Sequence, residues 1–184
     1  MTRATAQQVI DALGLTPAQT CGYVRVTYTS SLELAAHALP SPLQSPRPVG
    51  TALYFLVAPE APVRLHRIRN DQLYHYYAGD PLELLLLLED GTSSRHTIGP
   101  DILGGHNVQL LIPGGTFHTA RVAGDWFLGG STESPGVVPE DVELGDPDAL
   151  ALRHPDVAEL IRTYPLPATG EPRGSVPPDP ATRR

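Results

Sequence analysis

Short apolar runs that recur about every ten residues dominate the middle of this 184-residue chain. They lie between Thr51 and Thr132, are rich in aromatic and β-branched side chains, and are separated by turn-forming Gly, Pro and Asp residues. The eight runs are TALYFLV, VRLHRI, QLYHYYA, LELLLLL, SRHTI, NVQLLI, FHTARV and DWFLGGS. No segment of helical length separates them, so the spacing predicts an antiparallel sandwich or barrel rather than a parallel α/β sheet.

The amino-terminal part predicts one helix and one strand. Residues 5–14 carry apolar side chains at helical spacing between Thr5, a capping residue, and Gly14, which suits a left-handed exit. The sequence YVRVTYT at residues 23–29 predicts a strand. Four prolines predict an irregular loop over residues 38–48.

The carboxyl-terminal part predicts a short helical segment and then a tail. The apolar pattern of residues 148–163 indicates one or two helical stretches interrupted at Pro155. Residues 165–184 are rich in proline and nearly free of large apolar side chains, so we expect a disordered tail there. The remaining residues, 1–164, fit one domain.

Composition excludes several functions. The chain has 20 acidic and 13 basic residues, a net charge of −7 and a pI near 5.4, which argues against a nucleic acid or an anionic membrane as partner. All 13 basic residues are arginines, so a Schiff base, a lysine base and a phosphate-loop lysine are excluded.

Several features together predict a cytoplasmic, soluble protein. Cys21 is the single cysteine and has no partner for an internal disulfide. The first residues lack the pattern of a secretory leader. The longest apolar run, Leu84 to Leu88, is far shorter than the roughly 20 residues that cross a bilayer.

Two segments resemble the paired signatures of the cupin superfamily. They are HRIRNDQLYHYYAGDPLEL, from His66 to Leu84, and GHNVQLLIPGGTFH, from Gly105 to His118. The AGDPLEL string, together with GLTP and GYVRVTY near the start, is similar to the DUF985 or cupin 5 family from about residue 13 to residue 144. The resemblance implies an all-β fold, a cupin-type antiparallel jelly-roll β-barrel with a short N-terminal helix and a short C-terminal helical segment. It also implies a homodimer and a pocket at the barrel mouth, but no agreed reaction, because the fold hosts many chemistries.

The same resemblance places the usual cupin metal ligands at His66, Ile68, Gln72 and His118. Only two of these four are imidazoles, and an amide stands in place of the expected carboxylate, so we predict no metal cofactor. A divalent ion held by His66, His118 and a third ligand remains the alternative. His75 lies on the opposite strand face from Gln72 and would need a bulge to become that ligand.

Strand alternation selects the side chains expected inside the barrel. It groups Arg64 with His66, Gln72 with Tyr74 and Tyr76, Glu83 with Leu85 and Leu87, Gln109 with Leu111, and His118 with Ala120. The candidate catalytic residues are His66, His118 and Tyr76. The candidate substrate-binding residues are Arg64, Gln72, Tyr74, Glu83 and Gln109. Arg64 would bind a carboxylate or enolate oxygen of the substrate, or would instead pair with Glu83.

Three functions fit this set of side chains. The first is an isomerase- or lyase-type enzyme that acts on a small oxygenated or carboxylated metabolite by metal-independent acid/base chemistry, in specialised biosynthesis. The second is a metal-dependent oxygenase or isomerase, and the third is a noncatalytic small-molecule binder. For a homodimer, the apolar strands around residues 54–57 and 84–88 offer surface.

Overall fold

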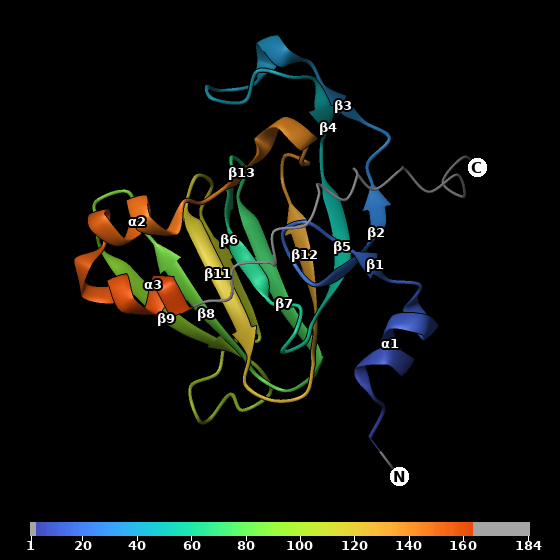
Figure 1. Ribbon diagram of the computed structural model, residues 1–184. Coiled ribbons are helices and arrows are strands. Elements are labelled where there is room, and N and C mark those ends of the chain that lie inside the picture. The colour runs from blue at the N-terminus through green and yellow to red at the C-terminus, as the bar shows by residue number, and fades with distance from the viewer. Residues whose placement is uncertain (1–2, 164–184) are drawn as a thin grey trace.

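Two antiparallel β-sheets packed face to face form most of the protein (Figure 1). The computed structural model describes residues 3–163, and the predicted tail over residues 165–184 lies outside them. The first sheet has the strand order β1 (Thr16–Pro17), β2 (Tyr23–Thr29), β5 (Thr51–Val57), β12 (Phe127–Glu133), β7 (Gln72–Gly79) and β10 (Gln109–Ile112). The second has the order β13 (Val142–Leu144), β6 (Val63–Ile68), β11 (Phe117–Val122), β8 (Leu82–Leu87) and β9 (Ser93–Ile98).

Each of the eight predicted runs forms a strand, and so does the run at residues 23–29. The two sheets are joined by isolated bridges, Cys21 with Val63 and Ile98 with Asn107, rather than by a continuous ladder. The predicted all-β, cupin-type jelly roll is therefore confirmed.

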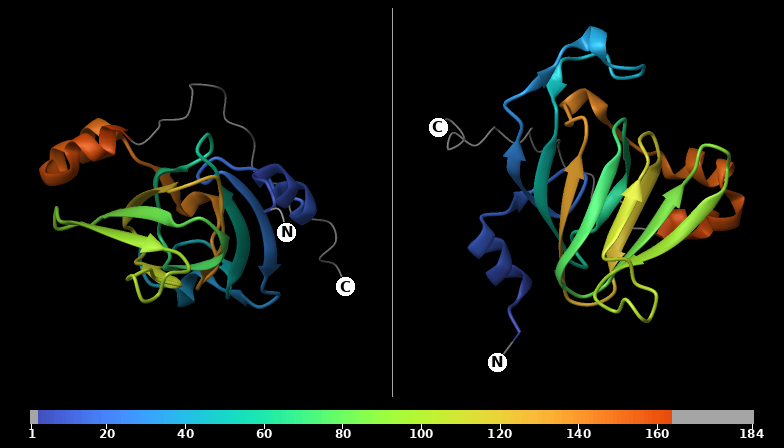
Figure 2. Two further views of the ribbon diagram at one scale, coloured as in Figure 1. Left: turned by 90° about the horizontal axis from the view of Figure 1, so that it is seen from below. Right: turned by 180° about the vertical axis from the view of Figure 1, so that it is seen from behind.

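Helices cover the outer faces of the two sheets on opposite sides of the molecule (Figure 2). The predicted amino-terminal helix is α1 (Ala6–Leu13), which is capped by Thr5 and ends at Gly14 in the left-handed conformation. Ile10 of this helix and Leu15, which follows it, pack on Leu56 of β5 and on Trp126, which precedes β12. No helix within residues 3–163 is long and apolar enough to span a membrane.

The predicted carboxyl-terminal helical segment is also present. It comprises α2 (Pro147–Arg153), the 3₁₀ turn η3 (Pro155–Val157) and α3 (Ala158–Thr163), with the interruption at Pro155 as expected. Leu150 and Ile161 of this segment pack on Leu85 and Leu87 of the second sheet. Because this face is covered, β8 is buried on both sides.

The interior between the sheets is a third, separate apolar cluster. It includes Val24, Phe55, Leu84, Leu86 and Phe127, which lie on the inner faces of four strands. Most of the two stretches proposed for dimerisation, residues 54–57 and 84–88, is buried within this chain. Residues 84–87 are at most 4% exposed and residues 55–57 at most 1%, whereas Tyr54 and Leu88 are half-buried.

A buried ion pair lies between segments at one end of the barrel, the upper end in Figure 1. The pair joins two segments: the excursion with η1 (Ala36–Ala38), β3 (Glu33–Leu34) and β4 (Arg47–Pro48), and the segment with η2 (Pro139–Asp141). Arg47 donates to Asp141 at 2.6 Å, and the two side chains are 1% and 0% exposed. Asn70 accepts from Arg47 at 3.5 Å and donates to the carbonyl oxygen of Pro135 at 2.6 Å. Polar contacts thus tie three connecting segments together at this end.

Candidate functional site

Two buried imidazoles lie side by side inside the barrel. His66 on β6 and His118 on β11 are direct register partners, and their ring centroids are 4.3 Å apart. Their side chains are 3% and 0% exposed. The resemblance to cupin metal sites predicts that these two residues lie together although they are 52 positions apart in sequence, and they do.

The turn before β11 positions His118. Gly115 has a φ of +81°, a conformation that favours glycine, and its N–H donates to the carbonyl oxygen of Ile68 at 2.7 Å. The N–H of Gly114 donates to the carboxylate of Asp71, also at 2.7 Å. These bonds join the turn to the β6–β7 connection, so the end of β6 and the start of β11, the two histidine-bearing strands, are held together.

Hydrogen bonds to the backbone define the tautomer of each imidazole. Nδ1 of His66 lies 2.7 Å from the carbonyl oxygen of Arg64, and Nδ1 of His118 lies 3.4 Å from that of Thr116. A carbonyl oxygen can only accept, so each Nδ1 carries the proton and each Nε2 is unprotonated and can accept. Nε2 of His118 accepts from the phenol of Tyr74 at 3.1 Å.

Burial keeps these groups neutral. Desolvation lowers the pKa of His66 to about 4. Desolvation, and then the neighbouring His66, hold the pKa of His118 well below its usual value. Desolvation raises the pKa of Tyr74 well above 10. At neutral pH the site therefore presents two unprotonated Nε2 atoms and one protonated phenol.

The three inward residues expected on β7 have different surroundings. Tyr74 is 2% exposed and contacts His118, and Gln72 is 6% exposed. Tyr76 lies away from the imidazoles, because its hydroxyl donates to the carbonyl oxygen of Gly79 at 2.9 Å. The geometry thus brings Tyr74, and not the proposed catalytic Tyr76, to the histidine pair.

Arg64 does not share the inner face with His66. The β6–β11 register pairs His118 with His66 but Ala120 with Val63, so β6 carries one extra residue between these two positions. Val63 and His66 both face inward, and the Arg64 guanidinium donates to the carbonyl oxygen of Gln19 at 3.1 Å. The expected anion clamp inside the barrel is therefore absent from the described residues.

Glu83 and Gln109 also lie outside the barrel. Glu83 accepts from Arg121 at 2.9 Å, with both side chains about half exposed, so the alternative Arg64–Glu83 pair does not form. Gln109 is exposed and donates to Nδ1 of His75, its register partner on the outer face of the first sheet. Alternation grouped each residue correctly with its strand neighbours but assigned the group to the wrong face.

Sequence reasoning missed a polar group next to Tyr74. Glu133, at the end of β12, is 4% exposed and accepts from Ser131 at 2.5 Å and from Thr51 at 2.7 Å. Burial raises its pKa. Cys21 is buried close by, and desolvation raises its pKa to about 12. Phe127, Ser131 and Glu133 stand at alternate positions of one strand, so they share a face. Because Phe127 is expected to face the core, this alternation could have predicted that Glu133 also faces inward.

The donor set does not fit the usual cupin metal site. Within residues 3–163, no three His, Cys, Asp or Glu side chains lie together so as to hold an ion. Each Nδ1 is held by a carbonyl group, as is usual for metal-ligating histidines, which leaves Nε2 of each ring with the lone pair. The other two positions carry Ile68 and the neutral amide of Gln72, so a three-ligand site cannot be built from them.

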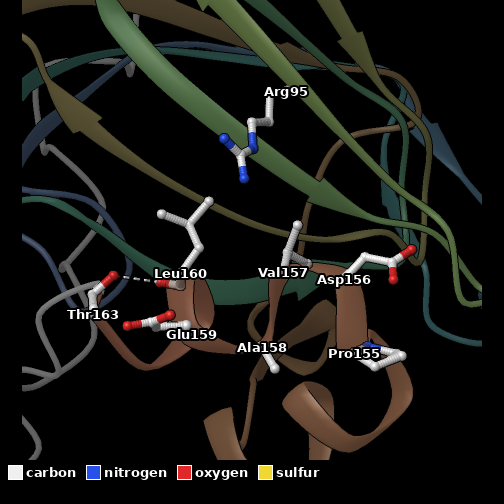
Figure 3. A pocket seen from close by; sticks show the side chains of 8 residues that line it. All are labelled: Arg95, Pro155, Asp156, Val157, Ala158, Glu159, Leu160 and Thr163. Carbon is white, nitrogen blue, oxygen red and sulfur yellow. Dashed lines mark hydrogen bonds between the residues drawn. The ribbon is translucent and has the colours of Figure 1, made fainter.

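A cavity of about 460 Å³ lies on the outer side of the second sheet, between β9 and α3 (Figure 3). Arg95 reaches over it from the sheet, and Asp156, Glu159 and Leu160 border it from the helical segment. Arg95 pairs in register with Leu85, which faces the helices, so the layer of β8 and β9 separates this cavity from the imidazoles. No residue predicted for the site lines it.

Fold and site together define a cupin-type barrel with an inward-facing pair of histidines. The sequence matches the family described as Cupin superfamily (DUF985) over residues 7–145, and the chain belongs to that family. No curated protein matches the sequence.

Two solved structures have the same fold. A hypothetical protein from Leishmania major is 28% identical, with a TM-score of 0.78 over 86% of this chain and 97% of its own. A protein from Shewanella oneidensis is 24% identical, with a TM-score of 0.78 over 90% of this chain and 100% of its own. A Bacillus subtilis oxalate decarboxylase mutant is a distant neighbour, at 13% identity and a TM-score of 0.48 over 80% of this chain and 36% of its own.

Proposed function

We propose that this protein is an enzyme of the isomerase or lyase type that moves a proton on a small oxygenated metabolite held inside the barrel, without a metal ion. The contact between His66, His118 and Tyr74 carries the proposal. It supplies an unprotonated base and a phenol within one shielded space, where hydrogen bonds to developing charge are strongest. Epimerisation, tautomerisation, cyclisation and dehydration all need such groups.

The tautomers assign a role to each side chain. Nε2 of His66 removes a proton from a carbon next to a carbonyl group, and the resulting imidazolium returns it to the product. The hydroxyl proton of Tyr74 is shared between Nε2 of His118 and the substrate oxygen on which negative charge develops. One proton leaves the substrate carbon and one returns to the product from the imidazolium, whose N–H can exchange with solvent, so this step needs no oxidant or reductant.

Access to the pair requires an opening, because both imidazoles are almost inaccessible to solvent. The segments joined by Arg47 and Asp141 lie at the nearest end of the barrel. We propose that these segments separate when a ligand enters.

Deuterium exchange tests the proposal. Because the substrate is not identified, the test uses a mixture of metabolites. Purified protein is incubated with a cytoplasmic metabolite extract in D₂O, and mass spectrometry follows metabolites that gain deuterium or are converted. We expect such a metabolite with the wild type and none with His66→Gln or His118→Gln. If both folded variants act like the wild type, the proposal fails. Conversion that appears only after a divalent metal is added favours the metal enzyme, and a retained ligand that is never converted favours the noncatalytic binder.

We also propose that two copies pair through the outer face of β7 and β10. Tyr77 and Leu111 on this face are 49% and 52% exposed, which is unusual for large apolar side chains grouped on one sheet. Light scattering after size exclusion should give a dimer for the wild type and a monomer for Leu111→Glu. Leu152→Glu, at an 82% exposed position on α2, is the matched control and should remain a dimer.

A further inference from the structure

Gln72 and Glu133 face each other on adjacent strands, one step from Tyr74 along β7. They are register partners, and Tyr74 pairs in the same ladder with Ser131. The two side chains are 6% and 4% exposed. The Gln72 amide hydrogen-bonds to the Glu133 carboxylate. The polar side chains of Gln72 and Glu133 therefore lie next to Tyr74, which contacts the histidine pair.

The Glu133 carboxylate has only neutral partners in the described part of the chain. Its hydrogen bonds come from Ser131, Thr51 and Gln72, and no arginine or histidine within residues 3–163 forms an ion pair with it. A buried carboxylate without a counter-charge is expensive. Arg64, the arginine expected inside the barrel, points elsewhere.

The second observation is an acceptor without a donor. Oε1 of Gln72 is shielded from solvent and has no hydrogen-bond partner among the described residues. Buried polar atoms in native proteins are nearly always satisfied, so an orphan of this kind points to a group that joins the site. The missing group must be a donor, because both Oε1 of Gln72 and the Glu133 carboxylate are acceptors.

We propose that Gln72 and Glu133 form a subsite for the protonated primary amine of a ligand. An ammonium group carries three donors and no acceptor, so it satisfies both oxygens and supplies the missing positive charge. A hydroxyl group brings only one donor and no charge. A carboxylate brings neither and is repelled by Glu133. The inference rests on the proposed function only in placing the ligand inside the barrel.

The test measures ligand-induced stabilisation with three probes of similar size: propylammonium chloride, 1-propanol and sodium propionate, at one ionic strength. Propylammonium should raise the melting temperature of the wild type by roughly 2–4 °C at about five times its dissociation constant, by mass action. Propanol and propionate should not. Glu133→Gln, which keeps the shape of the side chain, should lose the propylammonium shift, and Gln72→Met should reduce it.

The matched control is Glu83→Gln, which removes one carboxylate from the outer face and should keep the full shift. The proposal is overturned if propylammonium stabilises Glu133→Gln as much as the wild type, or if propionate stabilises the wild type equally. It is also overturned if none of the probes binds, in which case an internal water satisfies Gln72. These readouts report binding alone, so a negative result leaves the histidine chemistry standing, and an inactive His66→Gln variant that still binds propylammonium separates the two proposals.

Discussion

The phenol of Tyr74 donates a hydrogen bond to Nε2 of His118 at 3.1 Å, although the two residues belong to different sheets. This bond joins the sheets through the barrel interior and leaves Nε2 of His66 as the acceptor without a phenol donor. Replacing Tyr74 should therefore affect function and stability together.

Tyr74→Phe is expected to abolish substrate conversion and to lower the free energy of unfolding by about 1–3 kcal/mol, because it leaves the buried Nε2 of His118 without a donor. Tyr76→Phe makes the same chemical change at a hydroxyl that bonds only to the backbone, and should keep the conversion. Urea unfolding and the D₂O assay measure both effects. If the two variants lost conversion equally, Tyr74 would have no special role in the reaction.

The buried histidines should make stability fall in mild acid. The folded pKa of His66 is about 4 against 6.5 when unfolded, so between these values the unfolded chain binds more protons. The stabilisation is complete above pH 6.5 and is lost as the pH falls toward 4. Each buried histidine should cost about 2 kcal/mol of unfolding free energy between pH 7 and pH 5.

Denaturant unfolding at a series of pH values measures how the free energy of unfolding changes with pH, and so checks this prediction. His66→Gln and His118→Gln should each remove about half of this slope, whereas His37→Gln, at an exposed position, should leave it unchanged. An unaltered slope in both buried variants would mean that the imidazoles are not neutral in the folded protein.

Glu133→Gln should stabilise the protein at pH 8. Burial raises the folded pKa of Glu133 above its unfolded value, so between these two values the folded state binds more protons. The wild type therefore loses stability as the pH rises from the unfolded pKa through the folded one. The gain of the variant should be about 1.4 kcal/mol for each unit of that shift and should vanish near pH 4. Glu143→Gln, in a half-exposed pair with Arg67, should show no such pH-dependent gain.

Breaking the buried ion pair between Arg47 and Asp141 should lower the free energy of unfolding strongly. Arg47→Met leaves Asp141 buried without its partner, and we expect a loss of about 3–5 kcal/mol in unfolding free energy. Arg67→Met, at an exposed pair, should cost only about 0–1 kcal/mol. Adding Asp141→Leu to Arg47→Met should recover part of the loss, because no charge is then left buried. A loss as small as that of Arg67→Met would show that this end of the barrel is already open.

Local sequence patterns predicted the strands and part of the site. The period of two along β7 grouped Gln72, Tyr74 and Tyr76 correctly, and the glycine turn before His118 gave that strand its start. Both features depend only on local backbone geometry, which the nearby residues determine. The likeness to the cupin signatures then predicted that His66 and His118 meet, as they do in the fold.

Only the tertiary structure decided which face of each strand is the inside. Alternation yields two sets of residues per strand, and on β8 both are buried, one by the barrel and one by the carboxyl-terminal helices, so hydrophobicity could not place Glu83. One extra residue in β6 turned Arg64 away from His66, because a bulge is set by pairing with a neighbouring strand rather than by local sequence. Cross-strand pairing likewise brought Glu133 to Gln72, and such pairings between distant segments exist only once the chain is folded.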